Sequence, residues 1–112
     1  MKNDIYNKIG GILINSSPND SKKIIAKIEI SESNDVGTYT FNSTDFFDKS
    51  ESYRPISQAR DDLFSAMLEL KKYTIDNNLT NGNPIWVGCI VTVDIENAKI
   101  NIEFKYEPFI EE

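Results

Sequence analysis

The chain has 112 residues, a formal net charge of −6, no histidine and a single cysteine. Histidine is the usual general acid–base at neutral pH and the commonest metal ligand, so its absence removes the standard parts of most hydrolytic and metal-dependent enzymes. The lone Cys89 excludes an intramolecular disulfide, and the excess of carboxylates disfavours direct binding to the phosphate backbone of nucleic acids.

The length predicts one domain spanning residues 1–112. The first four residues are not followed by the long apolar run of a signal peptide, and the apolar stretch at residues 12–14 is too short to span a membrane. We therefore expect a cytoplasmic protein that does not enter a membrane.

Apolar residues at helical spacing predict a first helix over residues 3–15. Residues 22–31 alternate between apolar and polar side chains, which predicts a half-buried strand. A turn predicted at residues 33–35 leads into a second strand over residues 36–42. Because the turn is short, the two strands are expected to form an antiparallel hairpin.

The next segment, residues 43–55, is polar but contains the adjacent pair Phe46 and Phe47. Neighbouring side chains of an extended segment point to opposite faces, so both rings cannot point inward. Two interpretations stay open. Either one ring is exposed beside Asp45 and Asp48 as the anchor of a binding site, or the segment is irregular and both rings cover the edge of the sheet.

The main helix is predicted over residues 57–76. Ser57 is the expected N-cap, and Asp61 and Asp62 are expected near the positive end of the helix dipole. The apolar stripe of this helix consists of Ala59, Leu63, Met67 and Leu70, widened by Phe64 and Ala66.

Two further strands are predicted over residues 85–94 and 99–106. The first is apolar on nearly both faces, as a central strand would be, and its alternation puts Trp86 and Cys89 on opposite faces. Cys89 is expected to be a buried core residue and not a nucleophile. The order αββαββ predicts an α+β fold, in which an antiparallel sheet of about four strands carries both helices on one face.

Charge is distributed unevenly along the chain. Residues 29–62 hold eight acidic and three basic residues, whereas residues 1–28 hold two acidic and five basic residues. An acidic surface attracts a basic protein and speeds its encounter. The alternative is that the charge serves only solubility.

Three carboxylates of the polar segment, Asp45, Asp48 and Glu51, are close enough in sequence to bind a hard cation, but they lack the spacing of a calcium loop. A solvated acidic loop is the simpler interpretation. We expect no metal, no cofactor and no catalytic residues, and a cation-dependent enzyme remains one alternative.

The order and spacing of several features resemble the YezG-like immunity protein family, over most of residues 3–107. These features are Ile5-Tyr6 followed by Ile9, a loop at Pro18, a hairpin, a long Leu-rich helix, Trp86 at the entry to a strand, and the closing run from Lys99 to Tyr106. The chain departs from the family at Ser21-Lys22, where a Trp often precedes a Lys, and at Tyr106-Glu107, where Tyr-Asp is common.

The resemblance implies a small bacterial antitoxin that neutralises the toxin domain of a polymorphic or contact-dependent growth-inhibition system. The expected partner is the C-terminal domain of the cognate toxin, with a nuclease as one candidate, and the expected mechanism is stoichiometric occlusion by a monomer. The expected toxin-binding residues are Asp45, Phe46, Phe47, Asp48, Glu51, Asp61 and Asp62. The alternative function is a general acidic interaction or adaptor module without a toxin partner.

Overall fold

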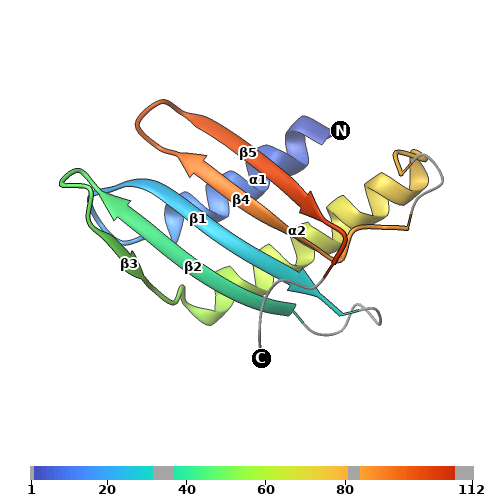
Figure 1. Cartoon of the computed structure of the whole chain (residues 1–112), viewed down its shortest axis with the longest axis horizontal. Coiled ribbons are helices and arrows are strands. Elements are labelled where there is room, and N and C mark those ends of the chain that lie inside the picture. Colours follow the sequence, from blue (N-terminus) through green and yellow to red (C-terminus); the bar gives the residue numbers. More distant parts are fainter. Residues whose placement is uncertain (1, 32–36, 81–83, 108–112) are drawn as a thin grey trace.

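The computed structural model describes residues 2–31, 37–80 and 84–107. Its elements follow in the order α1 (Lys2–Asn15), β1 (Ser21–Ile30), β2 (Gly37–Asp45), β3 (Ser50–Ser52), α2 (Ser57–Asp76), β4 (Gly88–Asp94) and β5 (Lys99–Lys105), as Figure 1 shows. The predicted α+β class is confirmed. The sheet has one strand more than expected, because β3 lies within the segment that was predicted to be a polar loop, and the turn predicted at residues 33–35 lies outside the described residues.

The five strands form one antiparallel sheet in the order β3-β2-β1-β4-β5. β1 is the central strand, and its register places Ala26 opposite Phe41 on one side and Val91 on the other. A central strand needs side chains that pack well on at least one face, which the alternating isoleucines of β1 provide.

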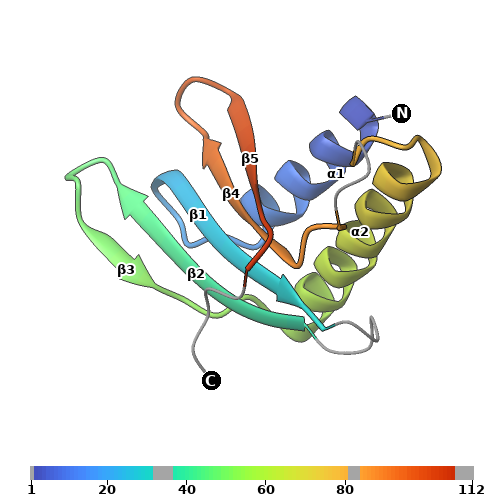
Figure 2. The ribbon, with the colours of Figure 1, turned by 45° about the vertical axis from the view of Figure 1, so that its right-hand side comes forward.

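Both helices lie side by side on one face of the sheet (Figures 1 and 2). The core lies between these two layers, and every second residue of β1, from Ile24 to Ile30, is buried in it. α1 contributes Ile5, Ile9 and Leu13. Each large apolar side chain buried in this way contributes roughly 1.5–3 kcal/mol, which compensates for the low helix propensity of the Gly10-Gly11 pair in α1.

The sheet face turned away from the helices is polar. On β1 this face carries Lys23 and Lys27, which are exposed, and Ile25, which is half-buried. Figure 2 shows no described helix over this face. The described part of the chain therefore has two layers, with helices on one face of the sheet and none on the other.

The start of α2 differs from its prediction. The N-cap position is Ile56 and not Ser57, and no side chain caps the helix. The first turn of α2 contains no acidic residue, so Asp61 and Asp62 lie one turn further along, where the dipole has less effect. Pro55, whose ring is buried, fixes the chain just before the helix and sets where it begins.

The predicted strand over residues 85–94 begins late, at Gly88, and this moves Trp86 into the core. Because residues 84–87 are not a regular strand, the alternation that would put Trp86 opposite Cys89 does not apply to them. The indole ring packs against Phe104, with ring centroids 5.2 Å apart. Cys89 is fully buried, as predicted, and burial raises the pKa of its thiol to about 12.

No helix in the described part of the chain is long and apolar enough to cross a membrane.

Candidate functional site

The predicted site centres on the turn between β2 and β3, which the structure builds as a tight hairpin. The backbone N–H of Asp45 donates to the carbonyl of Lys49 at 3.0 Å, and the N–H of Asp48 donates to the carbonyl of Asp45 at 3.0 Å. Below the turn, the hydroxyl groups of Thr44 and Ser50 lie 2.9 Å apart. These contacts close a short loop at one end of the sheet, at the far left of Figure 1.

The side chain of Asp45 organises this loop from within. Its Oδ1 accepts hydrogen bonds from the backbone N–H groups of Phe47 at 2.8 Å and Lys49 at 3.0 Å. Aspartate commonly stabilises turns by such bonds to the backbone two or more residues ahead. The bond from Lys49, together with the bond from Phe47, lowers the pKa of the Asp45 carboxyl. The ionised form of Asp45 therefore holds the loop.

Asp48 has a second structural role in the same loop. Its φ of 62° lies in the left-handed region, which aspartate tolerates better than most residues. Its carboxylate forms an ion pair with Lys22 at the start of β1, and this bond raises the pKa of the lysine. Lys22 was missed in the sequence analysis, although the hairpin pairing that sets Ser21 opposite Asp45 would have indicated it.

The two aromatic rings at the apex are both exposed. Phe46 is 57% exposed and Phe47 is 84% exposed. The interpretation in which both rings cover the sheet edge is therefore wrong. The other interpretation expected one exposed ring, and the structure exposes both. An ordered turn that holds two phenylalanines in water is unusual, because large apolar side chains are normally buried.

The structure separates the seven predicted residues into two groups. Asp45, Phe46, Phe47 and Asp48 lie in the hairpin turn, and Glu51 is exposed on the adjoining strand β3. Asp61 and Asp62 are exposed on α2 instead, where Asp62 accepts a hydrogen bond from the Gln58 side chain at 2.9 Å.

Asp61 lies near Tyr39, with whose hydroxyl group it interacts electrostatically. Tyr39 is six residues before Asp45 on β2, which corresponds to about 20 Å at roughly 3.3 Å per residue. The two acidic groups therefore face different surroundings and do not form one continuous patch around the rings.

Within the described residues, no group of three or more His, Cys, Asp or Glu side chains is arranged to hold a metal ion. Of the three carboxylates considered for a cation, Asp45 is bonded to backbone N–H groups and Asp48 to Lys22. What the hairpin offers to a partner is its exposed apolar surface.

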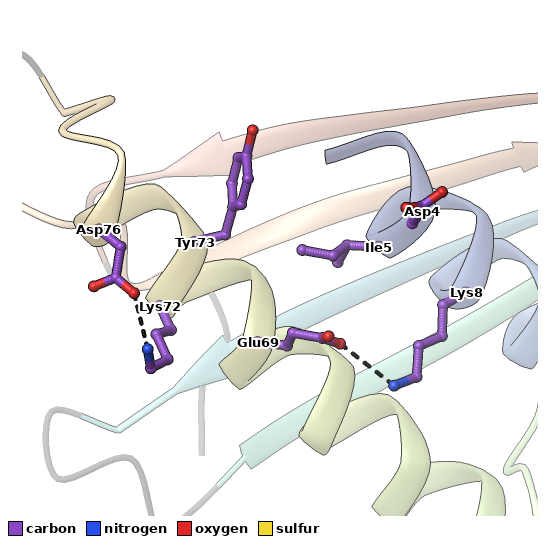
Figure 3. Close-up of a pocket in the computed structure, with 7 residues that line it drawn as sticks. All are labelled: Asp4, Ile5, Lys8, Glu69, Lys72, Tyr73 and Asp76. Carbon is purple, nitrogen blue, oxygen red and sulfur yellow. Dashed lines mark hydrogen bonds and ion pairs between the residues drawn. The ribbon is translucent and has the colours of Figure 1, made fainter. Parts of the chain in front are cut away.

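Apart from the hairpin, a hollow of about 380 Å³ lies between α1 and α2 (Figure 3). Four of its charged side chains form two ion pairs. Lys8 of α1 forms an ion pair with Glu69 of α2 at 3.3 Å, and Lys72 pairs with Asp76 within α2 at 2.8 Å. We interpret this hollow as the solvent-exposed seam of the helix pair, because these charges already satisfy one another.

Comparison with known protein families and with curated proteins found no match for this sequence.

Proposed function

We propose that the protein is an immunity protein that binds the C-terminal domain of a cognate bacterial toxin and neutralises it in the cytoplasm. The exposed pair Phe46–Phe47 on an ordered turn is the observation that carries the proposal. The resemblance of the chain to the YezG-like family supports the choice of a toxin as the partner. The absence of histidine and the buried thiol of Cys89 support a binding role over catalysis.

The proposed mechanism is stoichiometric occlusion by a monomer. Phe46 and Phe47 enter an apolar pocket of the toxin, and the hairpin then covers the toxin's active site or substrate groove. Aromatic anchors at the centre of an interface commonly carry most of its binding energy. Because Asp45 and the Lys22–Asp48 ion pair already order the turn, little conformational entropy is lost when it binds.

The remaining acidic residues contribute at longer range. Glu51 beside the hairpin, and the net charge of −6, would attract a basic toxin such as a nuclease and speed its encounter. Asp61 and Asp62 lie too far along the molecule to surround the rings, so we assign them to this steering effect and not to the anchor.

The test is to co-express the chain with the toxin domain encoded by the adjacent gene, and to measure complex formation and growth. We expect a one-to-one complex that restores growth. Phe46→Ala and Phe47→Ala should each weaken the complex roughly 30-fold or more, because truncating an interface hot spot costs about 2 kcal/mol or more. Ile75→Ala on α2 is the matched control, because Ile75 is also an exposed apolar residue and lies outside the hairpin.

Failure to bind the toxin domain or to restore growth would overturn the immunity proposal. A protective complex that tolerates both phenylalanine substitutions would instead overturn the hairpin as the binding surface.

The second candidate is an acidic interaction or adaptor module with no toxin partner, which the same exposed rings would also serve. It predicts that the chain binds a housekeeping protein through Phe46 and Phe47 and gives no protection from a toxin. The growth assay separates the two functions, and the alanine variants identify the surface in either case.

A further inference from the structure

A hollow of about 480 Å³ lies at the outer edge of β2. β3 pairs only with residues 42–44 of β2, so in the described structure residues 37–41 have no strand beside them on that side (Figure 1). The carbonyl of Phe41 points to this edge, where it accepts a hydrogen bond from the N–H of Tyr53 at 3.0 Å. Because backbone groups alternate along a strand, the N–H and C=O of Tyr39 point to the same edge.

Both arginines of the chain, Arg54 and Arg60, line this hollow. Arg54 follows β3 and Arg60 lies in the first turn of α2. Neither guanidinium forms an ion pair with a carboxylate among the described residues. Asp61, which is exposed, and Arg60 both act electrostatically on Tyr39. Within the described residues, these are two arginines without an ion pair in a chain whose net charge is −6.

Two of the residues that line the hollow each carry a buried polar atom without a hydrogen-bond partner in the described structure. These are the hydroxyl oxygen of Tyr53 and Nε of Arg60. Buried polar groups are rarely left unpaired. A polar group that loses its hydrogen bonds to water and gains no new partner raises the free energy of the folded state. Tyr53 belongs to a row of rings, 5.7 Å from Phe41, which in turn stacks on Tyr39 at 5.8 Å. This row of packed rings forms one wall of the hollow.

We infer that this hollow binds an extended segment of another protein that carries an Asp or Glu side chain. The segment pairs with the free edge of β2 at Tyr39, and its carboxylate accepts hydrogen bonds from Arg54, Arg60 and the Tyr53 hydroxyl. Addition of a strand to a sheet edge is a common mode of peptide recognition, in which backbone bonds give affinity and side-chain pockets give specificity. Arginine matches a carboxylate because its N–H groups form a planar fork.

A carboxylate fits better than a phosphate group here. The net charge of −6 repels a dianionic phosphate more strongly than a single carboxylate. The inference does not depend on the proposed toxin partner, because Phe46 and Phe47 lie at the other end of β2.

The test is a titration of the ¹⁵N-labelled full chain with the capped peptide acetyl-Thr-Val-Glu-Val-Thr-amide, followed by NMR. We expect the amide of Tyr39 to shift downfield and to exchange with solvent more slowly, because it gains a hydrogen bond. The same peptide with Gln in place of Glu should bind roughly tenfold more weakly, since hydrogen bonds to charged groups are the stronger ones.

Substitutions then assign the carboxylate contacts. Arg54→Gln and Arg60→Gln should each weaken binding roughly tenfold, and Tyr53→Phe roughly fivefold. Arg54 is exposed, so its variant is expected to fold even if Arg60→Gln does not. Lys99→Gln removes the same charge from an exposed residue of β5 and should leave binding unchanged. Phe47→Ala should also leave it unchanged, which separates this site from the hairpin.

Equal binding of the Glu and Gln peptides would overturn the inference. So would shifts confined to β5, the other free edge of the sheet, or the absence of any shift at millimolar peptide.

Discussion

Gly37, the first residue of β2, shows how closely single residues are constrained in this fold. A Cβ atom at this position would lie 2.7 Å from Cζ of Tyr39 and 2.8 Å from Cδ1 of Phe64, which is shorter than ordinary contacts. Both neighbours are ring atoms of large side chains packed against the core. The bare backbone of Gly37 therefore allows the Tyr39 ring to fold back over the strand.

We predict that Gly37→Ala destabilises the protein by about 1–3 kcal/mol, because overpacking forces side chains and backbone to shift. Gly11→Ala is the matched control. A Cβ there meets no atom within 4 Å, and Gly11 lies inside α1, so alanine should stabilise the helix by roughly 0.5–1 kcal/mol. Urea denaturation of the two variants measures both values, and the same sign for both would contradict this account.

At the same scale, the sequence identified the right residues for the hairpin but not all their roles. Phe46 and Phe47 were recognised because two adjacent rings conflict with strand alternation. The turn-forming role of Asp45 was not recognised, because only the register of the hairpin shows that its carboxylate reaches the N–H groups of Phe47 and Lys49. Arg60 and Tyr53 gave no local signal, since the hollow they line is formed by residues distant in sequence.

At the scale of elements, the turn of the β2–β3 hairpin is held by a carboxylate that titrates. Hydrogen bonds from the backbone N–H groups of Lys49 and Phe47 lower the pKa of Asp45 below its value in the unfolded chain. A lowered pKa means that the folded state prefers the ionised carboxylate, so ionisation of Asp45 stabilises the fold. Its stabilisation is present above the unfolded pKa of about 4 and is lost as the pH falls through the lowered folded pKa.

We therefore predict that the amides of Phe47 and Lys49 lose protection from solvent exchange as the pH falls below about 4. In Asp45→Asn this change should vanish, because the amide oxygen can accept the same bonds without titrating. The Asp94 carboxyl is the internal control, since its pKa is lowered separately by the Asn97 side chain in the β4–β5 turn. Its titration should persist in the variant, and loss of both titrations together would contradict a local effect.

Element boundaries followed the sequence where the periodicity was long. The second helix was predicted at its observed bounds, Ser57–Asp76, because its apolar stripe from Ala59 to Leu70 keeps helical spacing over about three turns. β3 escaped prediction, since a polar edge strand of three residues has no apolar face to create a pattern. The late start of β4 also could not be predicted, because Trp86 and Ile85 continue the apolar run of the strand although their backbone leaves the sheet.

For the whole molecule, the acidic protons of the buried Cys89 and of the half-buried Tyr39 and Tyr53 make stability depend on pH in the alkaline range. Burial raises the pKa of Tyr39, Tyr53 and Cys89 to about 12 in each case. In the unfolded chain the thiol titrates near ~8.5 and the phenols near ~10. The folded state thus keeps these protons at a pH where the unfolded chain releases them. The stability that these three groups contribute is therefore fully present below about pH 8 and is lost as the pH rises towards their folded pKa values.

We predict that the urea midpoint decreases steadily between about pH 9 and pH 11. The double variant Tyr39→Phe with Tyr53→Phe should show a shallower decrease above about pH 10, because two of the groups whose pKa is raised by burial are then gone, and only Cys89 and Tyr6 remain of that set. The measurement is a series of urea denaturation curves over this range. A midpoint that rises with pH, or a slope that the double variant leaves unchanged, would contradict the prediction.

Trp86 gives these experiments a built-in optical reporter. It is the single tryptophan of the chain, it is 1% exposed, and it packs against Phe104 at the β4–β5 side of the core. The β2–β3 hairpin and the hollow lined by Arg54 and Arg60 both lie on the opposite side of β1, along β2 and β3. Its fluorescence will therefore follow unfolding while staying silent to docking at either surface, so a variant that has lost a partner can be distinguished, without any label, from one that has lost its fold.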